Sequence, residues 1–518
     1  MELNDLPEHW DLIIIGGGIT GAGIFREAVR MGLRVLLLEQ HDFAWGTSSR
    51  SSKLIHGGLR YLKQGRFLLT RTSVRERQRL LHEAPGLVEP LPFLLPVYND
   101  HPADKIMLET GLSIYDILAK EKQHDYFDRT EFSLMAPHVR KKGLKGGFRF
   151  LDAQVDDARL VLRLINEGLE SGGVAKNYSK VSKILKNKRN EVTGVNVKDS
   201  ESNEERIFSC RLVINATGSW AETFHPSPVK GLHLRPLRGS HLIFPAWAIP
   251  LPQAISFFHP ADKRPLFVIP WEGAVFIGTT DVDFKEPLSF EPVITMEEVE
   301  YLMEGLTSLF PSLDITLDDC LSSYAGVRPV LSEGNLPPSE ETREHVVWVQ
   351  KGLITITGGK LTTFHRLAWD ALKAALPYLP PGTETVKNEP VFQPAPVKKG
   401  LVSNLDANII RRLYGRYGLK AEALIQNSDK RDLKIIPGTN TIWAELPYTA
   451  KNEHIRHLTD LLLRRTRIGL LLPGGGEAYL SHIQRICQPV LPWDNTKWED
   501  EKNQYLEHWK LKHKVPVK

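Results

Sequence analysis

Residues 11–39 read DLIIIGGGITGAGIFREAVRMGLRVLLLE and decide the fold class of this chain of 518 residues. Asp11–Ile15 is an apolar run typical of a buried strand, Ile19–Met31 has helical spacing, and Leu33–Glu39 is a second apolar run. A glycine-rich turn joins the first run to the helix. The stretch therefore predicts a strand, turn, helix and strand of the kind that builds a parallel α/β sheet.

The turn fits the pattern G-x-G-x-x-G through Gly16, Gly18 and Gly21. Glycine suits these positions because the turn is tight, the backbone must approach a pyrophosphate, and the helix must pack closely on the strand. The N-terminus of the helix offers N–H groups to phosphate, and Glu39 is placed to accept hydrogen bonds from a ribose. We therefore expect a dinucleotide site; the alternative is a glycine-rich turn in an unrelated α/β protein.

Three further segments favour FAD over NAD. Thr47–Lys53 is a hydroxyl-rich loop suited to a pyrophosphate and a flavin, although such a run alone is typical of a solvated loop. Val213–Gly218 resembles the strand-to-turn segment that glutathione-reductase-like flavoproteins place against their cofactor. Thr357–Thr363 would aim a helix N-terminus at the ring, where its partial positive charge would stabilise a reduced flavin.

Composition and charge exclude several other classes. Hydrophobic residues at 42% and charged residues at 25% are those of a folded globular chain. A net charge of +4 is too small to indicate nucleic-acid binding, and its excess lies in Leu401–Lys518, which carries 19 basic and 13 acidic side chains. Cys210, Cys320 and Cys487 form no C-x-x-C motif, so we expect a reducing compartment and no metal site.

Neither a secretory signal nor a membrane span is predicted. Met1–Trp10 carries acidic residues and a proline where a signal peptide needs a basic start and an apolar run. Leu242–Ala261 is the longest uncharged stretch, but its four prolines would break a membrane-spanning helix.

Five further segments follow one another along the chain: Lys53–Leu62, Val155–Leu160, Gly278–Asp281, Gly326–Pro329 and Gly358–Thr363. In this order they resemble the FAD-dependent glycerol-3-phosphate dehydrogenase family of the aerobic, quinone-linked type. Residues 461–467, LLLRRTR, are similar to the C-terminal helical domain of that family. Together with the cofactor segments, the resemblance implies contacts with FAD from Gly16, Gly18, Gly21, Glu39, Thr47, Ser48, Ser49, Ser52, Lys53, Leu54, Gly57, Gly58, Ala216, Thr217, Gly218, Gly358, Gly359, Lys360, Leu361 and Thr362.

The implied fold class is α/β and α+β: a glutathione-reductase-like FAD-binding fold with an interleaved antiparallel-sheet substrate domain and a C-terminal helical domain. A proline-rich connector before residue 395 precedes a C-terminal region in which we expect helices over 405–418, 450–468 and 476–487. We expect the FAD-binding domain at 10–80, 150–231 and 320–385, the substrate domain at 81–149 and 232–319, and the helical domain at 395–518.

The implied reaction is oxidation of sn-glycerol 3-phosphate to dihydroxyacetone phosphate, with hydride transfer to FAD and electrons passed to a membrane quinone. The alternatives are a glycerol-3-phosphate oxidase that uses oxygen and a non-catalytic FAD-binding protein. The resemblance also implies a cytoplasmic protein held peripherally at the cytoplasmic face of the inner membrane. The oligomeric state is left open, with a homodimer as one candidate.

Leu59–Arg79 is the first candidate for contact with an anionic membrane surface, because basic residues alternate there with apolar ones. The same spacing fits a solvated helix face equally well. The basic C-terminal segment is the second candidate.

A phosphate dianion needs fixed cations, each contributing roughly 1.5–3 kcal/mol through charge-assisted hydrogen bonds. Arg60, Arg328 and Lys360 lie beside turn residues in the family segments and are the predicted cations, although an average arginine is a surface charge or an ion-pair partner. Tyr61 and Thr279 are predicted to orient the substrate through their hydroxyls.

Oxidation of a secondary alcohol also needs a base with a pKa near neutrality. His56, next to the predicted cation of the first family segment, and His241 are the candidates. Arg328 is a further candidate, as proton acceptor or as stabiliser of the alkoxide. The sequence does not choose among them.

Overall fold

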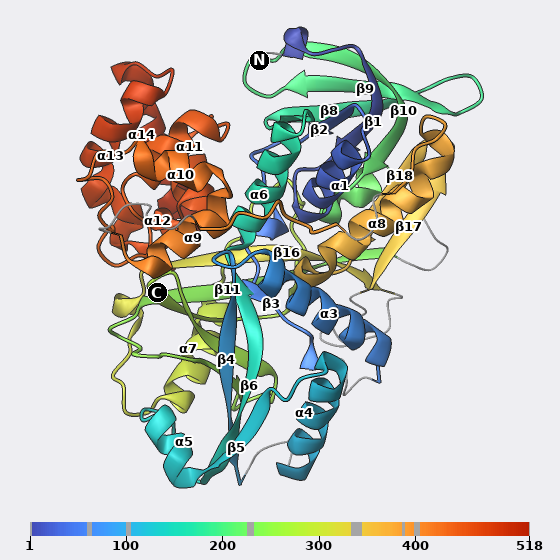
Figure 1. The fold of residues 1–518 in the computed structure, drawn as a ribbon. Coiled ribbons are helices and arrows are strands. Elements are labelled where there is room, and N and C mark those ends of the chain that lie inside the picture. Colours follow the sequence, from blue (N-terminus) through green and yellow to red (C-terminus); the bar gives the residue numbers. More distant parts are fainter. Residues whose placement is uncertain are drawn as a thin grey trace.

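The structure is a computed structural model that describes residues 3–59, 65–99, 105–224, 233–332, 344–385, 389–397 and 405–516. Two β-sheets with their helices, and a group of helices from the C-terminal part of the chain, make up the fold (Figure 1). The predicted fold class is therefore confirmed.

The first sheet contains the predicted strand, turn, helix and strand. Its central strands β18, β10, β1 and β2 run parallel, so that their carboxyl ends lie at the same edge. The helices α1, α6 and α8 pack over one face of this sheet (Figure 1). The strands are β1 (His9–Ile15), β2 (Val35–Leu38), β7 (Val174–Lys176), β8 (Ser179–Lys186), β9 (Val192–Asp199), β10 (Glu205–Asn215), β17 (His345–Gln350) and β18 (Leu353–Gly358). The helices are α1 (Ile19–Arg30), α6 (Asp157–Glu170) and α8 (Phe364–Ala375).

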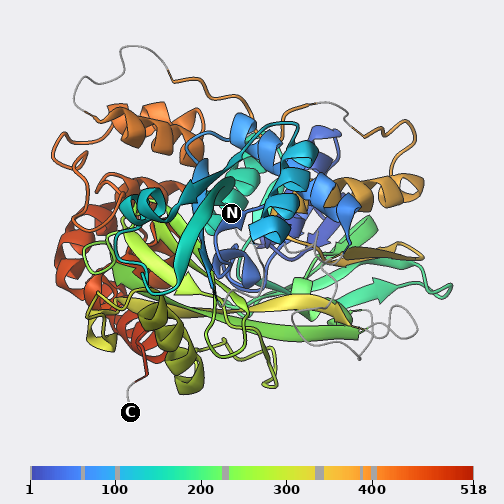
Figure 2. The same ribbon diagram turned by 90° about the horizontal axis from the view of Figure 1, so that it is seen from below.

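The second sheet is mostly antiparallel, as expected from the strand-rich region after residue 232. Its strands are β3 (Leu54–Ile55), β4 (Val88–Tyr98), β5 (His124–Asp128), β6 (Leu144–Val155), β11 (His233–Pro245), β12 (Ala254–Phe258), β13 (Pro265–Trp271), β14 (Ala274–Gly278), β15 (Val282–Asp283) and β16 (Ser322–Ser332). Its helices are α3 (Phe67–Glu83), α4 (Lys105–Ala119), α5 (Arg129–Met135) and α7 (Met296–Leu309). The helices α3 and α4 lie side by side in both views (Figures 1 and 2).

Two strands of this sheet differ from the expected segments. We expected 10–80 and 320–385 beside the first sheet, but β3 pairs with β6, and β16 pairs with β11 from His233 to Ile243. Such pairings are decided by partners far along the chain, which no local sequence pattern shows.

The C-terminal helices are α9 (Ala407–Tyr417), α10 (Lys420–Gln426), α11 (Glu445–Asn452), α12 (Ile468–Leu471), α13 (Leu480–Cys487) and α14 (Asn495–Lys512). A single helix over 450–468 was expected and is wrong. The chain instead has α11, a π-helical turn at Asp460–Arg465 and the short α12, with Arg467 in the left-handed region at φ 64°. This arrangement turns both Arg464 and Arg465 onto the carboxylate of Asp42.

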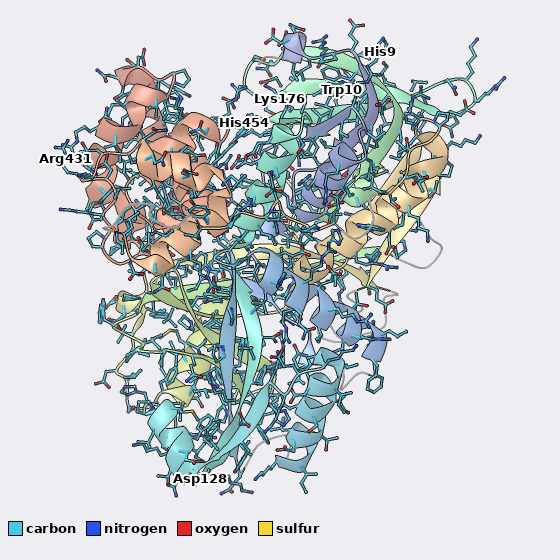
Figure 3. The ribbon with its side chains drawn as sticks, viewed as in Figure 1. His9, Trp10, Asp128, Lys176, Arg431 and His454 are labelled. Atoms are coloured by element: carbon cyan, nitrogen blue, oxygen red, sulfur yellow. The ribbon has the colours of Figure 1, made fainter. Side chains whose placement is uncertain are left out.

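Buried ion pairs join these helices to the first sheet. Arg467 binds both Asp156 and Asp157 at the start of α6. Figure 3 shows Lys176 and His454 on the two sides of this boundary, and Asp128 at the far end of the second sheet. Within the described residues, none of the helices combines the length and the apolar character that crossing a bilayer requires.

Candidate functional site

A cavity of about 2210 Å³ lies at the carboxyl edge of the first sheet and extends over the second. Drug-sized ligands occupy pockets of roughly 300–1,000 Å³, so this one has room for a dinucleotide together with a small substrate. Most of the predicted cofactor contacts line it. They are Gly16, Gly18, Glu39, Thr47, Ser48, Ser52, Leu54, Gly58, Ala216, Thr217, Gly218, Gly358, Gly359, Lys360, Leu361 and Thr362.

The glycine turn brings α1 very close to β1 and β10. Gly16 has φ 109°, and a Cβ added there would lie 2.6 Å from the carbonyl oxygen of Ala216. A Cβ on Gly21 would lie only 1.8 Å from the carbonyl oxygen of Gly16, so Gly21 serves this close approach rather than the cavity wall. Near the start of the helix, the N–H of Ile19 donates to Oγ of Ser48 at 2.9 Å. The turn and the Ser48 hydroxyl thus place polar groups beside the cavity.

Replacing Gly21 by alanine is expected to destabilise the fold by about 1–3 kcal/mol or more, because α1 must move away from β1 to admit the methyl group. Flavin should be lost with it. The check is thermal unfolding together with the ratio of flavin to protein absorbance. Gly111→Ala on α4 is the matched control, since its Cβ meets no protein atom within 4 Å. Gly111 lines the same cavity but on α4, away from the glycine turn, so the variant should leave both readings unchanged or slightly raise stability.

Glu39 lies at the cavity wall just after β2. Its Oε2 accepts a hydrogen bond from the N–H of Gly17 at 2.7 Å, and its Oε1 accepts one from the N–H of His41 at 2.9 Å. Burial raises the pKa of Glu39 despite these bonds. The side chain is fixed beside the glycine turn, where a ribose hydroxyl could donate to it.

Two predicted contacts in the hydroxyl loop face away from the cavity. Ser49 is buried, and Lys53 forms an ion pair with Asp157 at 3.1 Å. The Lys53 ammonium also lies 4.8 Å and 4.6 Å from the ring centres of Trp271 and Tyr324. Burial lowers the pKa of Lys53 to about 8. The structure places Lys53 as a buried link between the loop and α6.

The segment after β3 is held from two sides. The backbone N–H of His56 donates to Oγ1 of Thr362 at 3.1 Å, which ties it to the segment before α8. The N–H of Gly57 donates to the Tyr115 hydroxyl at 2.9 Å, and a Cβ on Gly57 would lie 2.2 Å from that oxygen. Gly57 therefore packs against α4, while the side chain of His56 lines the cavity.

Cationic side chains gather in the same cavity. Arg328 on β16 forms an ion pair with Asp281 at 2.9 Å and donates to the carbonyl of Thr280 at 2.7 Å. Lys360 donates to Oγ of Ser73 at 3.2 Å. Thr279 lies close to Arg328, because a Cβ on Gly239 would be 2.6 Å from both the Nη2 atom of Arg328 and the Oγ1 atom of Thr279. Arg328 and Thr279 are thus brought together, and Lys360 lines the same cavity.

Two residues of this group were not predicted. Arg264 lines the cavity and pairs with Asp281 at 3.5 Å, so Asp281 lies between two guanidinium groups. Asp281 is the last residue of the family segment Gly278–Asp281, so the sequence did contain a signal that could have identified it as a site residue. Arg264 stands in a hairpin between β12 and β13, where the sequence offers no motif.

The two candidate histidines have different environments. His241 is buried, its Nε2 lies 2.9 Å from Oγ of Ser52, and its ring stacks on Tyr324 at 4.5 Å. Burial, helped by the charges of Lys53 and Arg328, holds the pKa of His241 well below its usual range. His56 lines the cavity, and His241 is not among the lining residues. Arg60 and Tyr61 lie outside the described residues.

Comparisons with known proteins agree with this geometry. A family model described as "FAD dependent oxidoreductase" matches residues 11–403, and one described as "C-terminal domain of alpha-glycerophosphate oxidase" matches residues 356–498. An aerobic glycerol-3-phosphate dehydrogenase of Staphylococcus aureus (strain MRSA252) is 35% identical over 489 residues, covering 89% of this chain and 87% of that protein.

Solved structures show the same architecture. A glycerol-3-phosphate dehydrogenase from Bacillus halodurans, complexed with FAD, has a TM-score of 0.75 and 26% identity, covering 98% of this chain and 95% of its own. The L-alpha-glycerophosphate oxidase from Mycoplasma pneumoniae, with FAD bound, has a TM-score of 0.59 and 18% identity, covering 76% and 100%. The second likeness is one of fold.

Proposed function

Because the chain belongs to the FAD-dependent glycerol-3-phosphate dehydrogenase family, we propose that it oxidises sn-glycerol 3-phosphate to dihydroxyacetone phosphate and passes the electrons to a membrane quinone. One observation carries the proposal. The cations Arg328 and Lys360 line the same cavity as the predicted cofactor segments that follow β1 and β18.

The residues present fit FAD. The glycine turn, the carboxylate of Glu39 and the hydroxyl loop all border one cavity large enough for the dinucleotide. The segment Gly358–Thr362 leads into α8, whose N-terminus brings a partial positive charge to that part of the wall. When bound, FAD supplies the acceptor for the hydride that leaves the carbinol carbon.

The substrate phosphate binds the cationic group of the cavity. Arg328 offers a planar fork of donors, and Lys360 adds a point charge. Asp281 holds Arg328 in place through the ion pair described above, so that little side-chain entropy is lost on binding. With Arg264 there are three cations along the cavity, and they suit a substrate with a phosphate dianion better than an uncharged substrate or an amino acid.

His56 takes the hydroxyl proton. Its side chain lines the cavity, and its backbone is held by Thr362 beside the cofactor segment. His241 is less suited to this role, because burial lowers its pKa and so makes it a weak proton acceptor, and because it is not among the residues that line the cavity. Proton removal at the oxygen favours departure of the hydride from the adjacent carbon.

The N-terminal ends of α3 and α4 border the cavity, which suits delivery of electrons to a membrane-bound acceptor. Arg66, Phe67 and Met107, at these helix ends, line the cavity. Next to them, Leu68 is 78% exposed and Ile106 is 76% exposed. Exposed apolar side chains beside basic ones are typical of a peripheral contact with anionic lipid. We therefore propose that these helix ends contact the cytoplasmic face of the membrane.

Only part of the basic segment 59–79 belongs to this surface. Arg71 and Arg75 are exposed, but Arg77 is fully buried and pairs with Asp152 at 2.9 Å. Arg79 is directed toward Glu83. The basic residues Arg60 and Lys63 lie within 60–64, outside the described residues.

The double variant Leu68→Ser/Ile106→Ser is expected to bind vesicles that contain anionic lipid about tenfold or more weakly, since each leucine-sized side chain contributes roughly 1.5–3 kcal/mol when buried. Vesicle flotation measures this. Leu134→Ser on α5 is the matched control, being 79% exposed at the far end of the second sheet. Equal binding by the double variant and the wild type would contradict the proposed contact.

The electron acceptor is tested separately in the reoxidation half-reaction. The enzyme, reduced by sn-glycerol 3-phosphate, is mixed in a stopped-flow instrument with either a soluble quinone or oxygen. We expect fast reoxidation by quinone and slow reoxidation by oxygen. Rapid oxygen consumption with release of peroxide would instead identify an oxidase, the activity after which the matched C-terminal family model is named.

A further inference from the structure

We propose that Glu291, His508 and His513 form a binding site for a divalent transition-metal ion, with Zn²⁺ as the ion that suits the ligands best. One ligand atom from each of the three lies within 4.8 Å of the others. The site lies apart from the flavin cavity, whose lining includes none of the three. The inference does not depend on the proposed reaction.

The strongest indication is the imidazole of His513, which caps the end of α14. The residue is 5% exposed, and its Nδ1 donates to the carbonyl of Ser323 at 2.9 Å. Its Nε2 is buried and has no hydrogen-bond partner within the described part of the chain. Histidine ligands of metals usually donate a hydrogen bond from one ring nitrogen to a backbone carbonyl or a carboxylate, which fixes the ring, and bind the metal through the other nitrogen. An unpaired buried acceptor costs free energy, which a metal would recover.

The other two groups complete a set typical of zinc. His508 lies near the end of α14, with its Nε2 3.6 Å from Oε2 of Glu291. Glu291 stands in the connection between β15 and α7, and its Oε1 is paired with Arg50, which leaves Oε2 for a metal. Two imidazoles and one carboxylate, with a water in the fourth position, are a common tetrahedral arrangement for Zn²⁺.

Binding requires modest movement and must overcome nearby positive charge. Zinc–ligand distances are about 2.0–2.2 Å, so the three atoms must draw closer together than they now lie. His508 can move, because its side chain is 26% exposed at the end of a helix. Arg50, Arg464 and Lys512 are neighbouring cations, and Lys512 donates to the carbonyl of Glu291 at 3.4 Å. A bound ion would join α14 to the loop before α7.

No metal site is predicted from the sequence, because Cys210, Cys320 and Cys487 form no C-x-x-C motif. The proposed ligands instead come from two separate segments with no motif spacing, and only the fold brings them together.

The test is a titration of the FAD-loaded protein, first treated with a chelator and desalted, with Zn²⁺ in competition with a chromogenic chelator. We expect one tight equivalent per chain in the wild type and a rise in the unfolding temperature with Zn²⁺. His508→Gln should lose both effects. Because His508 is partly exposed, this variant should keep its fold, which retained FAD would verify. Glu291→Gln should also lose the tight equivalent, but it breaks the pair with Arg50 as well.

His9→Gln is the matched control, since His9 is an exposed histidine at the start of β1, far from the site (Figure 3). It should bind Zn²⁺ as the wild type does. Zinc binding that is equally tight in the wild type and in His508→Gln, or the absence of a tight equivalent in the wild type, would overturn the proposal.

Discussion

Replacing His56 by glutamine is expected to lower the rate of flavin reduction by sn-glycerol 3-phosphate by about 10²–10⁴-fold, the usual contribution of a general base. FAD should stay bound, because the contact with Thr362 is made by the backbone of His56 and survives the substitution. Anaerobic stopped-flow absorbance of the flavin measures the rate. In the wild type the rate should rise as the pH rises through the pKa of the base, and this rise should disappear in the variant.

His241→Gln is the comparison that separates the two candidate bases. The substitution disturbs a buried ring stacked on Tyr324, so it should lower stability. In the surviving FAD-loaded protein, however, the pH dependence of flavin reduction should be that of the wild type. The opposite pattern, with the pH dependence lost in His241→Gln and kept in His56→Gln, would reverse the assignment.

Arg328→Ala is expected to lower kcat/KM for sn-glycerol 3-phosphate by about 10²-fold or more. The variant removes a charge-assisted contact of roughly 1.5–3 kcal/mol, and it also takes from the buried Asp281 its ion pair with Arg328. The content of FAD should not change. Steady-state kinetics and the flavin-to-protein ratio test both statements.

Two further variants make the arginine experiment specific. Arg328→Lys keeps the charge but not the fork of donors, so it should recover only part of the activity. Arg411→Ala removes an exposed arginine that pairs with Glu89, and such surface pairs contribute about 0–1 kcal/mol. Its activity should equal that of the wild type. An unchanged rate in Arg328→Ala would remove Arg328 from the substrate site.

The parts of the site that the sequence predicted are those set by local backbone chemistry. The glycine turn and Glu39 could be found because a strand, a tight turn and a helix must follow one another in a fixed order. The segments after β10 and β18 could be found for the same reason, and the parallel pairing of these strands with β1 brings all three to one edge. Local constraints of this kind are visible in a single sequence.

The features that were missed depend on contacts between distant segments. Lys53 was expected at the cofactor, but Asp157 attracts its ammonium into the interior. Arg264 reaches the cavity because β13 pairs with β14, which places it near Asp281. The expected helix over 450–468 is broken where Arg464 and Arg465 bind the buried Asp42. Strand pairing decided the place of Arg264, and charge pairing across the fold decided the other two; a single sequence does not show which strands and which charges will meet.

The central claim is that this chain transfers electrons from sn-glycerol 3-phosphate to its FAD. The most direct measurement is an anaerobic titration of the purified, FAD-loaded protein with this substrate while the flavin absorbance is recorded, with glycerol as the unphosphorylated control. We predict that sn-glycerol 3-phosphate bleaches the flavin near stoichiometric addition and that glycerol at the same concentration does not. A flavin that stays oxidised in excess sn-glycerol 3-phosphate would contradict the account.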